Sequence, residues 1–131
     1  MAHTALITQN ADTANAVECT KLALNAPHAR VLRVTRIQYG ASGRPLARED
    51  VVLPLDRFPG LTADVSDITE LAQCYGLSLG RATERVSIVP ATRGVAMHLG
   101  ITAGTNVMKL DRVAETADGA PVEWRVAFRS I

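Results

Sequence analysis

The sequence predicts an α+β domain in which an antiparallel sheet packs against helices. Three observations favour this class. Short β-rich runs alternate with helical segments in the order βαββαβαββ, two pairs of runs are separated by glycine-containing turns, and successive strands are close enough along the chain to be antiparallel. At 131 residues the chain has the length of about one domain, so we expect residues 1–131 to form a single domain.

One pattern occurs twice, which predicts internal pseudo-symmetry. Residues 31–37 (VLRVTRI) match residues 107–113 (VMKLDRV) position by position, and residues 42–46 (SGRPL) match residues 118–122 (DGAPV) at the same spacing. A helix-like segment precedes each hairpin. Two copies are too few for a solenoid, so we expect two helix–hairpin units within one domain.

The chain begins with a strand and a helix. His3–Thr8 is a short β-type run. Asp12 or Thr13 can cap a helix that continues to about Asn25, because its apolar residues recur at helical spacing.

Two hairpins are predicted from β-rich runs that flank turn residues. Asp118-Gly119 is a strong hairpin signal, because a type I′ turn needs positive φ at both central residues. Ser42-Gly43 stands at the equivalent place in the first copy. We therefore expect two-residue type I′ turns in both hairpins. The expected strands are residues 30–39 with 44–53, and 107–115 with 121–128.

Between the hairpins the sequence predicts a helix, a strand and a second helix. Ser66 and Asp67 can both start the first of these helices. Residues 79–90 contain the strand, and the second helix closes at Gly100, which can take the left-handed conformation. We expect the helices to cover one side of the sheet.

Composition excludes several functional classes. The net charge is +1, from 14 basic and 13 acidic residues, so no strong field attracts nucleic acid or an anionic membrane. No apolar run approaches the ~18–20 residues that span a bilayer. Cys19 and Cys74 are far apart and have no metal-ligand spacing, which indicates reduced thiols in a cytoplasmic protein. No nucleophile, phosphate-loop or zinc motif is present, so we expect no catalytic residue, cofactor or metal.

Charged residues gather on one face of the predicted hairpins. With two-residue turns, Arg36 lies opposite Glu49 in the first hairpin. In the second hairpin Arg112 lies opposite Arg125 and diagonal to Glu123. Like charges directly opposite each other are unfavourable unless something anionic lies between them.

These residues allow two interpretations. They can form cross-strand ion pairs on a partly solvated sheet, which contribute about 0.2–1 kcal/mol each. They can instead line a ligand pocket, in which arginine binds an acidic group and glutamate binds hydroxyls or an amine. Ser66 has the same ambiguity, because a serine at a helix start is usually a cap but can also meet a ligand's phosphate or carboxylate.

The combined spacing of several short motifs resembles the UTRA effector-sensing domain, the ligand-binding half of the HutC-type branch of GntR-like transcription regulators. The first set of motifs is Arg33-x-x-Arg36, Gly43-x-Pro45, Glu49-x-x-x-Leu53-Pro54 and Phe58-Pro59-x-Leu61. The second set is Ala96-x-x-Leu99-Gly100-Ile101-x-x-Gly104-Thr105, Leu110-x-Arg112-Val113 and Asp118-Gly119-x-Pro121-Val122-Glu123. The resemblance covers nearly the whole chain from about Ala11.

This resemblance implies a chorismate-lyase-like fold, a small-molecule effector and a homodimer. It also implies a winged-helix DNA-binding domain upstream, outside these 131 residues, through which alone the protein would bind DNA. In characterised relatives the pocket uses residues that match Arg36, Glu49, Ser66 and Glu123, with Arg33 as the alternative first-hairpin arginine. The register adds Arg112 and Arg125 to this ligand-binding set.

We therefore expect an effector-sensing and dimerisation domain of a GntR/HutC-type regulator, without enzymatic activity, that binds a small and anionic molecule. Two alternatives stay open. A chorismate-lyase-like enzyme would hold a small anionic substrate with the same arginines and glutamates, and a pure dimerisation module would respond to no ligand. Fold does not fix function, so an assay must separate them.

Overall fold

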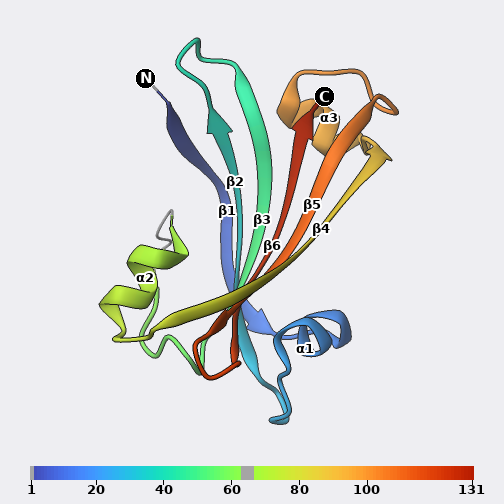
Figure 1. The fold of residues 1–131 in the computed structure, drawn as a ribbon. Helices are drawn as coiled ribbons and strands as arrows, with labels where there is room; N and C mark the ends of the chain where they lie inside the picture. The colour runs from blue at the N-terminus through green and yellow to red at the C-terminus, as the bar shows by residue number, and fades with distance from the viewer. Residues whose placement is uncertain (1, 63–66) are drawn as a thin grey trace.

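The computed structural model describes residues 2–62 and 67–131, in which six strands form one sheet accompanied by three short helices (Figure 1). The order βαββαβαββ is confirmed. In chain order the elements are β1 (His3–Thr13), α1 (Ala16–Leu22), β2 (Arg30–Tyr39), β3 (Pro45–Pro54), α2 (Ile68–Cys74), β4 (Leu79–Pro90), α3 (Arg93–Leu99), β5 (Asn106–Thr116) and β6 (Pro121–Ser130).

The sheet has the order β1-β2-β3-β6-β5-β4, and all neighbouring strands are antiparallel. The second strands of the two hairpins, β3 and β6, pair at its centre. The helix that precedes each hairpin reaches the other hairpin, since α1 contacts β6 and α3 contacts β3, and α3 also contacts β6 of its own hairpin. The two predicted helix–hairpin units are therefore interlocked.

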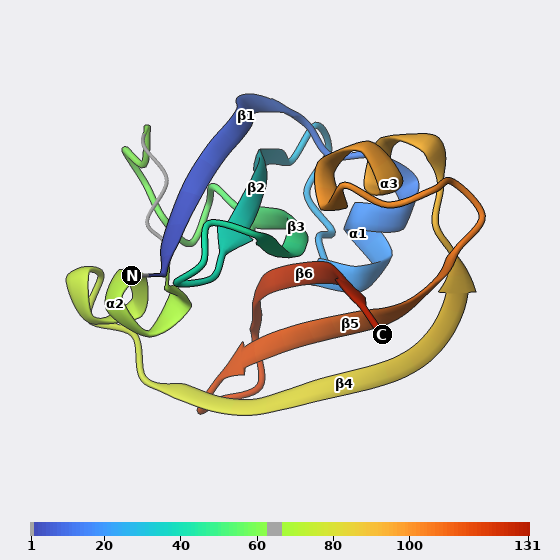
Figure 2. The ribbon, with the colours of Figure 1, turned by 90° about the horizontal axis from the view of Figure 1, so that it is seen from above.

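The helices cover both faces of the sheet. Leu22 of α1 packs with Val31, whereas Ile68 of α2 packs with Leu32. Successive residues of a strand point to opposite faces, so α2 lies on the face opposite α1. Figure 2 shows α1 and α3 on one side of the central strands and α2 on the other. The expectation that all helices lie on one side is wrong, because β2 buries apolar side chains on both of its faces.

The hairpin turns are not of type I′. Gly119 has a φ of +91° and Gly43 a φ of +82°, but Asp118 is not among the residues with positive φ. Thr116 accepts a hydrogen bond from Gly119 N and donates one to Ala120 O, at 2.9 and 2.8 Å. This is a three-residue loop with a glycine bulge, the alternative that spares a non-glycine residue the left-handed conformation.

We expect Gly119→Val to lower the free energy of unfolding by more than about 1 kcal/mol, because a β-branched residue resists a φ of +91°. Gly119→Asn is the matched control, since asparagine tolerates this conformation and should cost less. Urea unfolding of the three proteins measures the difference. Equal stabilities for the valine and asparagine variants would contradict the conformation of this turn.

The start of α1 also differs from the prediction. The strand β1 continues to Thr13, and Asn15 caps α1 by accepting a hydrogen bond from Glu18 N at 2.8 Å. The Glu18 side chain accepts one from Asn15 N in return, which completes a capping box. The helix ends at Leu22, and not near Asn25, because Ala23 adopts a left-handed conformation. At the end of α3, Gly100 has the predicted positive φ.

Candidate functional site

Six charged residues form a line across one face of the sheet, which we call the charge row. Its members are Arg36 on β2, Glu49 on β3, Arg125 and Glu123 on β6, Arg112 on β5 and Glu84 on β4. Both predicted registers are confirmed, because Arg36 pairs with Glu49 and Arg112 with Arg125. Each arginine has a glutamate within 4 Å, although Arg112 and Arg125 lie directly opposite each other on β5 and β6.

The inner part of the charge row is a buried ion pair with a second cation. Arg36 Nε donates a hydrogen bond to Glu49 Oε1 at 2.8 Å, and the two residues are 2% and 5% exposed. The other carboxylate oxygen of Glu49 lies 3.5 Å from Arg125 Nη1. One buried carboxylate therefore holds two guanidinium groups, and the interpretation as surface ion pairs does not fit these residues.

The outer part of the charge row is more loosely connected. Arg125 Nε lies 3.7 Å from Glu123 Oε1, and Arg112 Nε lies 3.8 Å from Glu84 Oε1, which is too long for a hydrogen bond. Within the described residues, Glu123 Oε1, Arg125 Nε and Arg112 Nε are buried without a hydrogen-bond partner. Buried polar atoms of this kind are rare because they lose their contacts with water. The row thus holds one unused acceptor and two unused donors.

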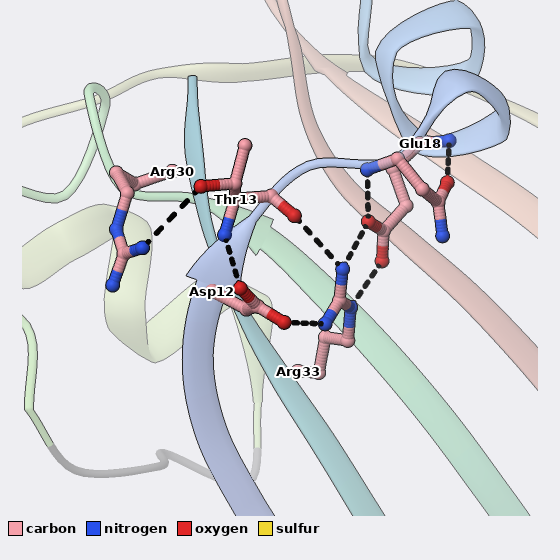
Figure 3. Close-up of polar contacts among 6 residues, drawn as sticks. Asp12, Thr13, Glu18, Arg30 and Arg33 are labelled. Carbon is pink, nitrogen blue, oxygen red and sulfur yellow. Dashed lines mark hydrogen bonds and ion pairs between the residues drawn. The ribbon is translucent and has the colours of Figure 1, made fainter. Parts of the chain in front are cut away.

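Arg33, the alternative to Arg36, lies on the opposite face of β2 and has other partners (Figure 3). Its Nε and Nη2 donate to the two carboxylate oxygens of Glu18 at 2.7 and 2.8 Å, and its Nη1 donates to Asp12 Oδ2 at 3.0 Å. A further bond reaches Thr13 O at 3.1 Å. Arg33 therefore connects the start of α1 to the end of β1, and of these two arginines only Arg36 belongs to the charge row.

Burial shifts the pKa of Glu123. The residue is 2% exposed, and this loss of water raises the pKa of its carboxyl group above the ordinary value of 4.5. The nearby guanidinium groups of Arg125, Arg36 and Arg112 oppose the shift without cancelling it. Glu18 behaves in the opposite way, because its hydrogen bonds with Arg33 lower the pKa of the Glu18 carboxyl.

We expect Glu123→Gln to remove a fall in stability that accompanies rising pH. The pKa of folded Glu123 is raised, so this carboxyl stabilises the fold below its unfolded pKa and loses that contribution as pH rises through the folded pKa. Glu18, with its lowered pKa, stabilises the fold above its unfolded value and loses that contribution as pH falls.

Urea unfolding of the parent, Glu123→Gln and Glu18→Gln between about pH 3 and pH 8 measures both effects. Relative to the parent, Glu123→Gln should gain stability with rising pH and Glu18→Gln should lose it. Parallel pH profiles for all three proteins would contradict the opposite shifts.

Five of the six predicted ligand-binding residues come together in the charge row, namely Arg36, Glu49, Arg112, Glu123 and Arg125. The sixth, Ser66, lies outside the described residues. Sequence reasoning missed Glu84 as a member of this site. The alternation of β4 does place Glu84 on one face of its strand, but α3 separates β4 from β5, so no turn fixes their register.

The described parts of the chain have neither a cluster of metal-binding side chains nor a helix that could span a membrane. Across residues 2–62 and 67–131, no three histidine, cysteine, aspartate or glutamate side chains gather as a metal site would require. Among the helices of these same residues, none has the length and apolar character needed to cross a membrane.

Comparison with known proteins gives matches over nearly the whole chain. The family model of the UTRA domain matches residues 1–128. The ligand-binding domain of a protein assigned to the GntR family of transcriptional regulators, from Bordetella bronchiseptica, is 26% identical in sequence with a TM-score of 0.87. That match covers 98% of this chain and 84% of the other chain.

A second relative is PhnF from Mycobacterium smegmatis. The effector domain of PhnF is 25% identical, covers 99% of this chain and 81% of its own, and has a TM-score of 0.88. The longer PhnF structure is 26% identical with a TM-score of 0.87, and this chain, matched over 98% of its residues, spans only 58% of it. The present chain therefore belongs to the UTRA domain family and has the fold of the effector domains of GntR-family regulators.

Proposed function

We propose that the chain senses a small-molecule effector as part of a GntR-type regulator of the HutC branch, and that the effector binds at the charge row. The observation that carries the proposal is a set of buried atoms without a hydrogen-bond partner, namely Glu123 Oε1, Arg125 Nε and Arg112 Nε. Similar structures are described as a ligand-binding domain and an effector domain, which supports the same role here.

The chemistry of these atoms indicates which chemical groups the effector would carry. Arg125 and Arg112 offer donors that suit a carboxylate or phosphate, and Glu123 offers a carboxyl group that suits a hydroxyl or an amine. The two arginine donors favour an anionic group on the effector, and Glu123 favours a hydroxyl or an amine beside it. An anionic effector with a polar group beside its acidic group therefore fits the charge row. On sequence grounds, Ser66 completes the site.

The proposed mechanism is a population shift in a cytoplasmic homodimer. An effector held between the two hairpins favours one arrangement of the dimer, and an upstream winged-helix domain in each copy changes its spacing on DNA. The greater length of PhnF leaves room for such a domain in that relative.

Light scattering should give the mass of a dimer at tens of micromolar, and a monomer at that concentration would contradict the assembly.

A thermal-shift screen with small carboxylic acids, sugar phosphates and amino-acid derivatives tests effector sensing. Binding to the native state raises the unfolding temperature in proportion to ligand excess. The same compounds are then tested on Arg125→Ala and on Arg44→Ala, a matched control at an exposed arginine outside the row. A stabilising compound should lose its effect on Arg125→Ala alone. Equal stabilisation of both variants would place the site elsewhere.

An enzymatic role is the competing hypothesis, and we propose that the chain has none. A chorismate-lyase-like enzyme would release pyruvate from chorismate, whereas a sensor would leave chorismate intact. Pyruvate release by the parent, abolished in Glu123→Gln, would overturn the proposal.

A further inference from the structure

A cavity lies between α1, β4 and β5, and we propose that it is a second binding site, which holds one small anion through a phosphate or carboxylate group. This α1 cavity has a volume of about 190 Å³ and is lined by Lys21, Thr83, Arg85, Asp111 and Val113. Pockets for drug-sized ligands have volumes of about 300–1,000 Å³, so the α1 cavity suits a smaller molecule. The proposal does not depend on the effector site proposed above.

The α1 cavity lies on the face of the sheet opposite the charge row. Along β6, Trp124 stands between Glu123 and Arg125, and successive side chains of a strand point to opposite faces. Trp124 therefore lies on the other face from its two neighbours. Asp111 lies on the same face as Trp124, because the two side chains are hydrogen-bonded. The α1 cavity and the charge row thus share strands but no side chain.

A hydrogen bond and an ion pair fix one wall of the α1 cavity. Trp124 Nε1 donates to Asp111 Oδ1 at 2.9 Å, and Lys21 Nζ lies 3.5 Å from Asp111 Oδ2. The Lys21 ammonium group also lies 5.7 Å from the centroid of the Trp124 ring, within the range of a cation–π interaction. Both carboxylate oxygens of Asp111 already have a partner, and Lys21 is held in place. A positioned cation loses less conformational entropy when a ligand binds.

Arg85 supplies a positive charge that this arrangement leaves unused. It lies directly opposite Asp111 in the β4–β5 register. Within the part of the chain that the structure describes, the Arg85 guanidinium group nevertheless has no hydrogen bond or ion pair, because Asp111 is engaged by Trp124 and Lys21. Lys109, opposite Ser87 on the same face, adds a further cation. The positive charges beside the α1 cavity therefore exceed the charge of Asp111, which favours an anion.

The remaining groups of the α1 cavity indicate how the anion would be held. A guanidinium group can donate two parallel hydrogen bonds to one phosphate or carboxylate, and an ammonium group adds a point charge. An anion between Arg85 and Lys21 would use both. Thr83 and Val113 lie directly opposite each other beside them. The Thr83 hydroxyl offers a further donor, and Val113 offers an apolar contact for a short carbon chain.

Trp124 reports on the α1 cavity, since it is the single tryptophan of the chain and donates a hydrogen bond to Asp111. The test titrates the parent with sodium phosphate and with sodium acetate, while sodium chloride keeps the ionic strength constant, and follows tryptophan fluorescence. We expect a saturable change with at least one of the two anions and none with chloride alone. Saturation by phosphate alone would identify a phosphate site, and saturation by acetate alone a carboxylate site. No saturable change with either anion would overturn the proposal.

Three variants locate the bound anion. Arg85→Gln should raise the apparent dissociation constant at least about fivefold and leave the melting temperature unchanged, because its side chain is exposed. Arg81→Gln is the matched control, since it removes the same charge from the same strand outside the α1 cavity. Arg125→Ala removes a cation of the charge row instead. Both Arg81→Gln and Arg125→Ala should bind the anion like the parent.

Two results of this comparison would overturn the proposal. Equal weakening in Arg85→Gln and Arg81→Gln would show that the anion responds only to the general charge of β4. Weakening in Arg125→Ala with parental binding in Arg85→Gln would place the anion in the charge row, and it would leave the proposed effector site intact.

Discussion

Arg36→Ala is expected to lower the free energy of unfolding by about 3 kcal/mol, because it leaves a buried carboxylate without its main partner. Glu49 is 5% exposed and accepts its hydrogen bond from Arg36 at 2.8 Å. Arg125, at 3.5 Å, remains as a weaker partner, so the expected cost lies at the low end for a broken buried pair. Urea unfolding followed by circular dichroism measures it.

The double variant Arg36→Met with Glu49→Leu separates the loss of a partner from the loss of the pair. Replacing both charges by apolar side chains of similar size should recover much of the stability, since neither charge of the pair is left alone and Arg125 keeps Glu123 as a partner. A cost below about 1 kcal/mol for Arg36→Ala would contradict a buried ion pair, because exposed ion pairs contribute that little. A double variant less stable than Arg36→Ala would show that the two charges stabilise the fold by more than their mutual pairing.

Gly80→Ala should cost about 2 kcal/mol or more, because a side chain at Gly80 has no room. A Cβ atom there would lie 2.8 Å from both Ala117 Cα and Thr116 O, and these backbone atoms belong to the second hairpin. Gly40→Ala is the matched control. Its Cβ would meet only side-chain carbons of Leu46, at 3.3 Å, and this leucine is 46% exposed and can move.

The control should change stability by less than about 0.5 kcal/mol, since its steric cost is offset by the lower entropy of the unfolded chain. Thermal unfolding of both variants provides the comparison. Equal melting temperatures for Gly80→Ala and Gly40→Ala would contradict the close approach of β4 to the turn between β5 and β6.

Features that depend on neighbouring residues could be predicted from the sequence. The pairing of Arg36 with Glu49 and of Arg112 with Arg125 was predictable, because strand periodicity and a turn glycine together fix the register of a hairpin. The turn type was predicted wrongly, because Asp-Gly also suits a three-residue loop in which only Gly119 has positive φ.

Features that depend on distant residues could not be predicted. Asp12 looked like a helix cap, but its carboxylate binds Arg33, and the helix begins three residues later after the Asn15 cap. Glu84 joins the charge row through the β4–β5 pairing, which no turn specifies. The position of α2 likewise follows from long-range packing against Leu32. In each case the decisive contact joins segments that local patterns treat separately.

The central claim is that the charge row binds the effector through Glu123. The direct test is calorimetric titration of the compound that most stabilises the parent, using the parent, Glu123→Gln and Glu18→Gln. Glu18 is the matched control, because it is 3% exposed compared with 2% for Glu123 and belongs to the Arg33 cluster on the opposite face. We expect Glu123→Gln to weaken binding by about tenfold to a hundredfold, as the loss of a buried, charge-assisted hydrogen bond predicts, and Glu18→Gln to bind like the parent. Parental affinity in Glu123→Gln, or an equal loss in both variants, would contradict the claim.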